Sequence, residues 1–230
     1  MSRFKREKAK KRKFRMTQEE KRVCVLIPSD DRVATTFCMA LQRMTQRTLV
    51  EQPEGLSQLS VQMYGSTILP FSRQQLALYA LEQNATHTLW IDSDMSFPED
   101  MLLRFLRRDE TLIGINAMSR RPPYRCTAQS APGEPMVTKP ETTGLEKMHR
   151  MGFGVLWAAT SVYRDMDVPY FDFEYVPEKG CWRGEDYVFF EKARAAGHEC
   201  YVDHDLSKQV NHHGDFGFNP LMMAQMGAME

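Results

Sequence analysis

The stretch LWIDSDMS, residues 89–96, changes abruptly from apolar to acidic. Leu89, Trp90 and Ile91 are typical of the end of a buried strand, and Asp92 and Asp94 follow at once. Residues two apart in an extended chain point the same way, so the two carboxylates would lie side by side. Such carboxylates repel each other unless a positive charge compensates them. The pattern therefore indicates either a divalent cation at the end of a strand or a solvated turn before a helix.

Strand-like and helix-like segments alternate around this stretch. We expect strands at residues 23–28, 59–65, 86–91, 111–117, 151–160 and 198–203. We expect helices at residues 33–47, 72–83, 98–108 and 184–197, with Ser72 and Ser96 as caps of the second and third. The alternation in the first half predicts an α/β fold with parallel β-α-β units. Residues 119–150 show no clear period and are expected to form a long loop or small hairpin.

The charge of the chain is segregated although its net charge is zero. Residues 1–15 carry nine Lys or Arg and one Glu, a net +8, so the remaining 215 of the 230 residues sum to −8. We expect a basic arm at 1–20, a single domain at 21–217 and a Met-rich tail at 218–230. The arm is either a solubilising tail or an attachment to nucleic acid or another polyanion through residues 3–15.

The five cysteines have no regular spacing, which favours reduced thiols in a cytosolic protein. No apolar run approaches the roughly 20 residues that a membrane helix needs. The basic N-terminus lacks a following apolar segment, which argues against a signal peptide. These features predict a cytoplasmic protein without a membrane span.

Other polar clusters also follow expected strands or open helices, and in a parallel α/β sheet ligands lie beyond the carboxyl ends of the strands. The clusters are Pro28-Ser29-Asp30-Asp31-Arg32, Gly184-Glu185-Asp186 and His212-His213, with Arg73 and Trp182 as single residues of interest. Each also has a structural explanation. Acidic residues are favoured at any helix start, the histidines suit a surface loop, and the tryptophan is either a stacking platform or part of the core.

The order of these features resembles GT-A-fold glycosyltransferases, the family-two-like enzymes common in bacteria and phages. The resemblance covers about 190 residues, from 23 to 214. It is carried by VCVLIP at 23–28, SRQQL at 72–76, THTLWIDSDMSFPEDML at 86–102, GFG at 152–154, GEDYVFFEKARAAGHE at 184–199 and HHG at 212–214. It implies the GT-A fold, a mostly parallel central sheet flanked by helices.

The resemblance also implies an activity, the transfer of a sugar from a nucleotide-diphosphate donor to an acceptor hydroxyl with Mn²⁺ or Mg²⁺ as cofactor. A UDP-sugar is the favoured donor. The implied donor-binding residues are Pro28, Ser29, Asp30, Arg32, Arg73, Asp92, Ser93, Gly152 and Gly154. Of these, residues 28–32 would lie against the base and ribose, and Arg73 would approach the uracil or the diphosphate.

The remaining implied roles belong to the cation and the acceptor. Asp94 would ligate the cation, Asp92 would face the ribose and the cation, and His212 would complete the shell, with His213 as the alternative. The implied acceptor-side residues are Glu185, Asp186 and Trp182, with Asp186 as general base if the enzyme inverts the anomeric configuration.

Two other classes of function compete with this one. A nucleotidyltransferase of similar fold would carry a glycine-rich loop after its first strand, and SDDRV at 29–33 lacks glycine. A non-enzymatic nucleic-acid-binding protein would act through the basic arm, but the acidic remainder of the chain would add little affinity. The charge segregation also suggests a transferase whose acceptor is attached to a polyanion, for example a modified base in DNA. A sugar, lipid or protein acceptor is the alternative.

Overall fold

The computed structural model describes residues 20–30, 32–120 and 124–214. The predicted Met-rich tail lies outside the described residues, as does all of the predicted basic arm except Glu20. Among the residues that the structure describes, no helix is long and apolar enough to span a membrane. All five cysteines are unpaired, as their irregular spacing predicted.

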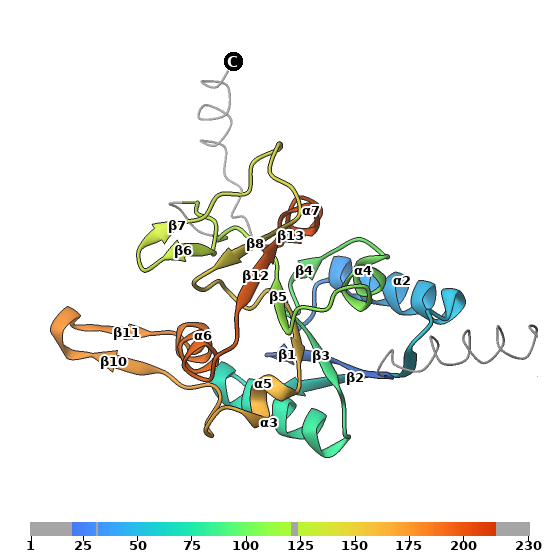
Figure 1. Cartoon of the computed structure of the whole chain (residues 1–230), viewed down its shortest axis with the longest axis horizontal. Helices are drawn as coiled ribbons and strands as arrows, with labels where there is room; N and C mark the ends of the chain where they lie inside the picture. The colour runs from blue at the N-terminus through green and yellow to red at the C-terminus, as the bar shows by residue number, and fades with distance from the viewer. Residues whose placement is uncertain (1–19, 31, 121–123, 215–230) are drawn as a thin grey trace, which may run out of the picture.

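A seven-stranded sheet in the order β2-β1-β3-β9-β5-β12-β8 forms the centre of the molecule (Figure 1). Its strands are β1 (Lys21–Ser29), β2 (Leu56–Gly65), β3 (His87–Ile91), β5 (Leu112–Gly114), β8 (Leu145–Met148), β9 (Val155–Ala159) and β12 (Cys200–Asp203). Five of them run parallel, and β9 and β8 run antiparallel to their neighbours. The prediction of a mostly parallel α/β sheet is confirmed, with β9 inserted against the direction of β3 and β5.

Helices cover both faces of this sheet. They are α2 (Thr35–Glu51), α3 (Leu69–Glu82), α4 (Met101–Leu106), α5 (Ser161–Arg164), α6 (Glu185–Ala195) and α7 (His204–Ser207). Apolar side chains of α3 and α6 pack into one core, and those of α2 and α4 pack into a second core. Figure 1 shows α3 and α2 on opposite sides of β1 and β3. The resulting three layers leave the carboxyl ends of the parallel strands available for a site.

Both predicted helix caps are wrong. The helix α3 begins at Leu69, with Pro70 in its first turn, so Ser72 lies inside the helix and donates to the Ile68 carbonyl. The helix α4 begins only at Met101, and Ser96 belongs to the short strand β4 (Met95–Ser96). This strand pairs antiparallel with β13 (Asn211–His212), and that long-range pairing keeps Ser96 extended.

Two hairpins complete the described fold. The segment 119–150, expected to be a loop or small hairpin, contains the hairpin of β6 (Gln129–Ala131) and β7 (Glu134–Pro135) and then β8. The second hairpin joins β10 (Glu174–Val176) and β11 (Cys181–Arg183) through a turn of 3-10 helix, Pro177–Lys179. This second hairpin leads directly into α6 and was not expected from the sequence.

Candidate active site

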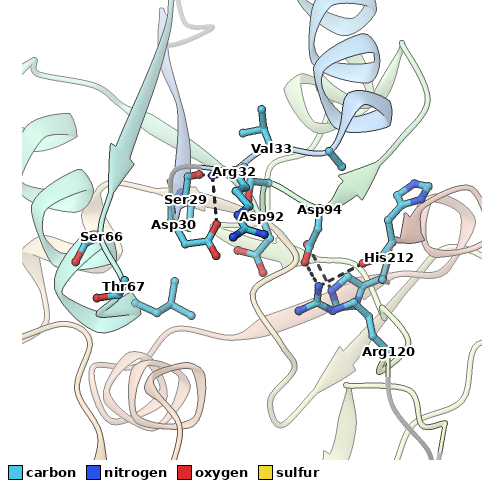
Figure 2. Close-up of a pocket in the computed structure, with 16 residues that line it drawn as sticks. Ser29, Asp30, Arg32, Val33, Ser66, Thr67, Asp92, Asp94, Arg120 and His212 are labelled. Atoms are coloured by element: carbon cyan, nitrogen blue, oxygen red, sulfur yellow. Dashed lines mark hydrogen bonds and ion pairs between the residues drawn. The ribbon is translucent and has the colours of Figure 1, made fainter. Parts of the chain in front are cut away.

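A pocket of about 650 Å³ opens where β1 and β3 end (Figure 2). The predicted site residues that line it are Pro28, Ser29, Asp30, Arg32, Asp92, Ser93, Asp94 and His212. These residues come from three segments that are far apart in the sequence. The fold therefore brings together the predicted base, ribose and cation residues in one cavity.

Two side-chain hydrogen bonds connect Arg32 to the end of β1 on one wall of the pocket. The Ser29 hydroxyl donates to the Arg32 carbonyl at 3.0 Å, and the Asp30 carboxylate accepts the Arg32 N–H at 3.3 Å. The Ala34 N–H donates to the Ser93 carbonyl at 3.1 Å and so connects this wall to the segment after β3. Two polar residues after β2, Ser66 and Thr67, face the same cavity.

Asp92 belongs to a cluster behind the pocket, which we call the buried cluster: Asp92, Arg73 and Glu185. Arg73 Nη2 donates to Asp92 Oδ1 at 2.9 Å, and Arg73 Nε donates to Glu185 Oε1 at 3.3 Å. The Arg73 side chain is only 2% exposed. Its guanidinium carbon lies 4.7 Å from the ring centre of Phe153, a cation–π distance. Arg73 thus joins α3 to β3 and α6.

The charge of Arg73 is needed because burial raises the pKa of the Asp92 carboxyl. The guanidinium opposes this shift, whereas the nearby Asp94 and Glu185 carboxylates add to it. Removing the arginine would leave two carboxylates close together with little solvent. Arg73 does not line the pocket, and its buried side chain does not favour direct contact with a donor. That contact, implied by the resemblance, stays a prediction.

Asp94 belongs to a second cluster, which we call the pocket cluster: Asp94, Arg120 and His212. Arg120 Nη1 lies 2.6 Å from Asp94 Oδ2, and His212 Nε2 lies 3.5 Å from Asp94 Oδ1 (Figure 2). His212 Nδ1 lies 2.8 Å from the Met118 carbonyl. A carbonyl only accepts, so Nδ1 carries a hydrogen and Nε2 is the nitrogen that faces Asp94.

The three members of the pocket cluster influence one another's protonation. Burial acts to raise the pKa of Asp94, but the contact with His212 and the charge of Arg120 outweigh it and lower that pKa. Conversely, the Asp94 carboxylate raises the pKa of His212. The cluster is therefore built to keep a negative charge on Asp94 next to the cavity.

Asp94 and His212 fit a divalent cation. Asp94 Oδ1 is buried and accepts no hydrogen bond from any residue that the structure describes. Its 3.5 Å separation from His212 Nε2 is close to the roughly 3.0–3.4 Å expected between neighbouring ligands of one cation. The hydrogen bond from His212 Nδ1 to a backbone carbonyl is the support that metal-binding histidines usually have.

The donor set is small. Across residues 20–30, 32–120 and 124–214, no three histidine, cysteine or carboxylate side chains are placed to hold a cation together. Asp92, the third predicted ligand, has Oδ1 bound to Arg73, so its role as a ligand stays a prediction. A cation held by Asp94 and His212 would take its other ligands from phosphate oxygens and water, as Mg²⁺ commonly does.

His213 has a different position from His212. Its backbone N–H donates to the Asp94 carbonyl at 2.8 Å, and its Nε2 lies 2.7 Å from the Ser96 hydroxyl. Both contacts hold β13 against β4. Of the two histidines that the sequence left as alternatives, His212 is the one that faces Asp94.

Asp186 lies in the first turn of α6 but not in the pocket lining. Burial and the charge of Glu185 raise its pKa to about 6, while the Tyr187 N–H, which donates to Oδ1 at 2.8 Å, opposes the shift. A carboxylate with this pKa is deprotonated at neutral pH and is well matched to accepting a proton. Glu185 instead has its Oε1 bound to Arg73.

The remaining predicted residues lie outside the pocket lining. The Gly154 carbonyl accepts the Asp92 N–H at 3.0 Å, and a Cβ at Gly154 would lie 3.1 Å from Met95 Cε. Gly152 faces Thr127, where a Cβ would lie 3.3 Å from the Thr127 Cβ. Trp182 lies on β11, is 68% exposed and packs against Tyr175 at 5.3 Å between ring centres. Gly154 thus supports Asp92, and Trp182 is a surface residue.

Arg120, Ser66 and Thr67 line the pocket although no sequence motif indicated them, and Arg120 is the charged one among them. It lies in the irregular segment 119–150, which has no period that would indicate the direction of a side chain. No residue near it in the sequence belongs to a recognisable motif. Only the fold places its guanidinium at Asp94.

Comparisons with known proteins support the fold but do not assign a family. No protein-family model and no curated protein sequence matches the chain. Among solved structures, A197 from STIV matches with a TM-score of 0.52 and 10% identity, covering 86% of this chain and 97% of its own. The catalytic domain of Drosophila beta1,4-galactosyltransferase 7, solved with xylobiose, matches with a TM-score of 0.51 and 13% identity, covering 89% of this chain and 79% of its own. The chain has the GT-A fold of such glycosyltransferase structures.

Proposed function

We propose that the protein is a nucleotide-sugar-dependent glycosyltransferase that moves a sugar from a nucleotide diphosphate to an acceptor hydroxyl. One observation carries the proposal: Asp94, Arg120 and His212 converge at one side of a pocket that is also lined by residues following β1 and β2. The GT-A fold supports the same reading, since a galactosyltransferase domain shares it. Placement among the family-two-like bacterial and phage enzymes stays a prediction.

The donor would lie along the pocket. Its nucleoside would contact Ser29, Asp30 and Arg32, and its diphosphate would lie at the pocket cluster. The size of the cavity, about 650 Å³, suits a ligand of this class. A UDP-sugar is the favoured donor. When bound between Asp94 and His212, Mn²⁺ or Mg²⁺ would neutralise the charge that develops on the leaving diphosphate.

Asp186 would act as general base. Its carboxylate takes the proton of the acceptor hydroxyl while the acceptor oxygen forms a bond to the anomeric carbon. The bond from that carbon to the diphosphate oxygen breaks, and its electron pair leaves with the diphosphate. Glu185 would not share this role, because its Oε1 is bound to Arg73. It would instead position the start of α6, and with it Asp186.

A thermal-shift panel tests this proposal directly. The intact protein would be heated with UDP-, GDP- and CMP-sugars, each with and without Mn²⁺. We expect one nucleotide class, UDP, to raise the melting temperature, and Mn²⁺ to increase that shift. A folded protein that responds to none of these ligands would rule out the glycosyltransferase function.

The acceptor is a separate part of the proposal. The net +8 of residues 1–15 against −8 elsewhere supports an acceptor attached to a polyanion, for example a modified base in DNA. Deleting residues 1–15 is then expected to weaken transfer to a polymeric acceptor, and the intact protein should lose that transfer steeply as salt rises. Equal activity of the intact and shortened proteins on such acceptors at low salt would argue for a sugar, lipid or protein acceptor.

A further inference from the structure

Arg120 occupies an unusual position for a cation in a proposed metal site. Its Nη1 lies 2.6 Å from Asp94 Oδ2, the oxygen that His212 does not face. Its side chain is 46% exposed, and it also lines the pocket. Asp94 therefore contacts the Arg120 guanidinium through Oδ2, while its Oδ1 faces the imidazole of His212, the candidate metal ligand.

The aliphatic stem of Arg120 packs against the backbone, and its charged head contacts Asp94. A Cβ placed on Gly214 would lie 3.2–3.5 Å from three carbons of the Arg120 side chain, so the stem packs closely over this glycine. Besides Asp94, the head has a weak contact to the His213 carbonyl at 3.4 Å. A half-exposed guanidinium with a fixed stem can change partners by rotating its last bonds, without movement of the backbone.

The chemistry of the two possible partners favours such an exchange. A guanidinium offers a planar fork of donors that matches two phosphate oxygens at once. A carboxylate that takes a divalent cation loses most of its attraction for a neighbouring guanidinium, because the cation neutralises it. A diphosphate entering the pocket supplies new negative charge at the same place.

We propose that Arg120 is a diphosphate-binding residue that pairs with Asp94 in the free protein and transfers to the donor's diphosphate when Asp94 takes the cation. The inference rests on the proposed function and adds to it a residue that the sequence did not indicate. Arg120 competes with the cation for Asp94 before the donor arrives and assists the cation afterwards. Cation and diphosphate binding are thereby coupled through one side chain.

The exchange predicts effects of opposite sign from one substitution. Arg120→Met removes the competitor, so Mn²⁺ alone should bind the free protein about 1.5–5-fold more tightly, the range of a weak exposed ion pair. The same variant lacks the fork, so inorganic pyrophosphate and UDP, each with saturating Mn²⁺, should bind about 10–100-fold more weakly. Arg120→Lys keeps the charge without the fork and should give a smaller loss for pyrophosphate.

Binding is measured by titration calorimetry and by the electron paramagnetic resonance signal of free Mn²⁺, so no turnover is needed. Arg125→Met is the matched control, because Arg125 is exposed and outside the pocket. The folding of each variant is checked by circular dichroism, and Arg120→Lys provides the test if the methionine variant does not fold.

The outcomes separate this inference from the proposed function. If the wild-type protein binds Mn²⁺ and UDP but Arg120→Met binds both as the wild type does, the exchange is wrong and the function stands. Weaker binding of Mn²⁺ alone in Arg120→Met would also overturn the exchange, since Arg120 would then support the cation from the start. If the wild-type protein binds neither Mn²⁺ nor any nucleotide, both proposals fail together.

Discussion

Asp92 and Asp94 lie two residues apart, and each contacts an arginine, yet the two clusters differ physically. Arg73 in the buried cluster is 2% exposed and is shared by Asp92 and Glu185. Arg120 in the pocket cluster is 46% exposed and contacts Asp94 next to a free carboxylate oxygen and an imidazole. The guanidinium of the buried cluster is enclosed, whereas that of the pocket cluster borders the cavity. We therefore expect the first cluster to maintain the shape of the site and the second to bind the ligands of the proposed function.

The largest expected difference between the clusters is in stability. Arg73→Met would leave the buried Glu185 and the partly exposed Asp92 without their cation. This should lower the free energy of unfolding by about 3 kcal/mol, the lower end of the range for breaking a buried ion pair. Arg120→Met removes a half-exposed ion pair and should change it by about 1 kcal/mol or less. Urea denaturation of both variants checks this. Equal losses of stability would show that the two clusters do not differ in this way.

The second comparison is between neighbours at the start of α6. Asp186→Asn should bind UDP with Mn²⁺ as the wild type does but lose turnover about 100-fold or more. Because the pKa of Asp186 is raised to about 6, the base is protonated below that pH, so wild-type turnover should fall as the pH is lowered through about 6. Steady-state rates between pH 5 and 8 measure this.

The control for Asp186 is its neighbour. Glu185→Gln removes a charge from the buried cluster, so its effect should fall mainly on stability, with a pH profile still governed by Asp186. If Asp186→Asn lost donor binding instead, or if Glu185→Gln abolished the pH dependence, the division between the two carboxylates would be wrong.

The third comparison is between the two aspartates themselves. Asp94→Asn should weaken Mn²⁺-dependent binding of UDP by at least about 10–100-fold, the loss that follows even when only a residue supporting a metal ligand is changed. Asp92→Asn keeps a hydrogen-bonding group beside Arg73 and should weaken that binding less. Calorimetry of UDP with and without Mn²⁺ measures both, and Asp167→Asn, an exposed carboxylate outside the pocket, serves as control. A larger loss in Asp92→Asn would assign the cation to Asp92.

The smallest expected effects separate the two histidines. His213→Ala removes the contact to Ser96 and should lower the free energy of unfolding by about 0.5–1.5 kcal/mol, the usual value of one hydrogen bond. His212→Ala should mainly lower the affinity for Mn²⁺, with little change in the free energy of unfolding. Denaturation and Mn²⁺ titration of both variants compare them. If only His213→Ala lost affinity for Mn²⁺, His213 and not His212 would be the metal ligand.

The parts of this molecule that were predictable from the sequence are those controlled by local apolar pattern. Runs such as VCVLIP and THTLWI are buried strands because several consecutive apolar side chains fit the interior of a sheet. The direction of β9 was not predictable, because the pattern of apolar residues in a strand does not depend on whether its neighbours run parallel or antiparallel to it. Ser96 has the local pattern of a cap, but its pairing with a strand more than a hundred residues away overrode that pattern.

The residues of the site also fall into those that the sequence predicted and those that it did not. The motif residues after β1 and β3 were predictable, and they do line one pocket. Arg120 was not, because it lies in a segment without periodicity, and its relation to Asp94 exists only in the folded chain. Likewise, two adjacent histidines are equivalent in a sequence. The hydrogen bond of His212 to the Met118 carbonyl and that of His213 to Ser96 distinguish them.

The pairing of β4 with β13 has a consequence for how the protein would lose activity. Each strand has two residues, and β13 is held by this pairing, by the His213 contacts and by the hydrogen bond of His212 to the Met118 carbonyl. Such a short edge element opens by local fluctuation at far lower cost than the seven-stranded sheet. Opening would carry His212 away from Asp94 while the rest of the molecule stays folded. On heating, inactivation should therefore precede unfolding, and amide hydrogen exchange at His212 and His213 should be much faster than in β1 or β3.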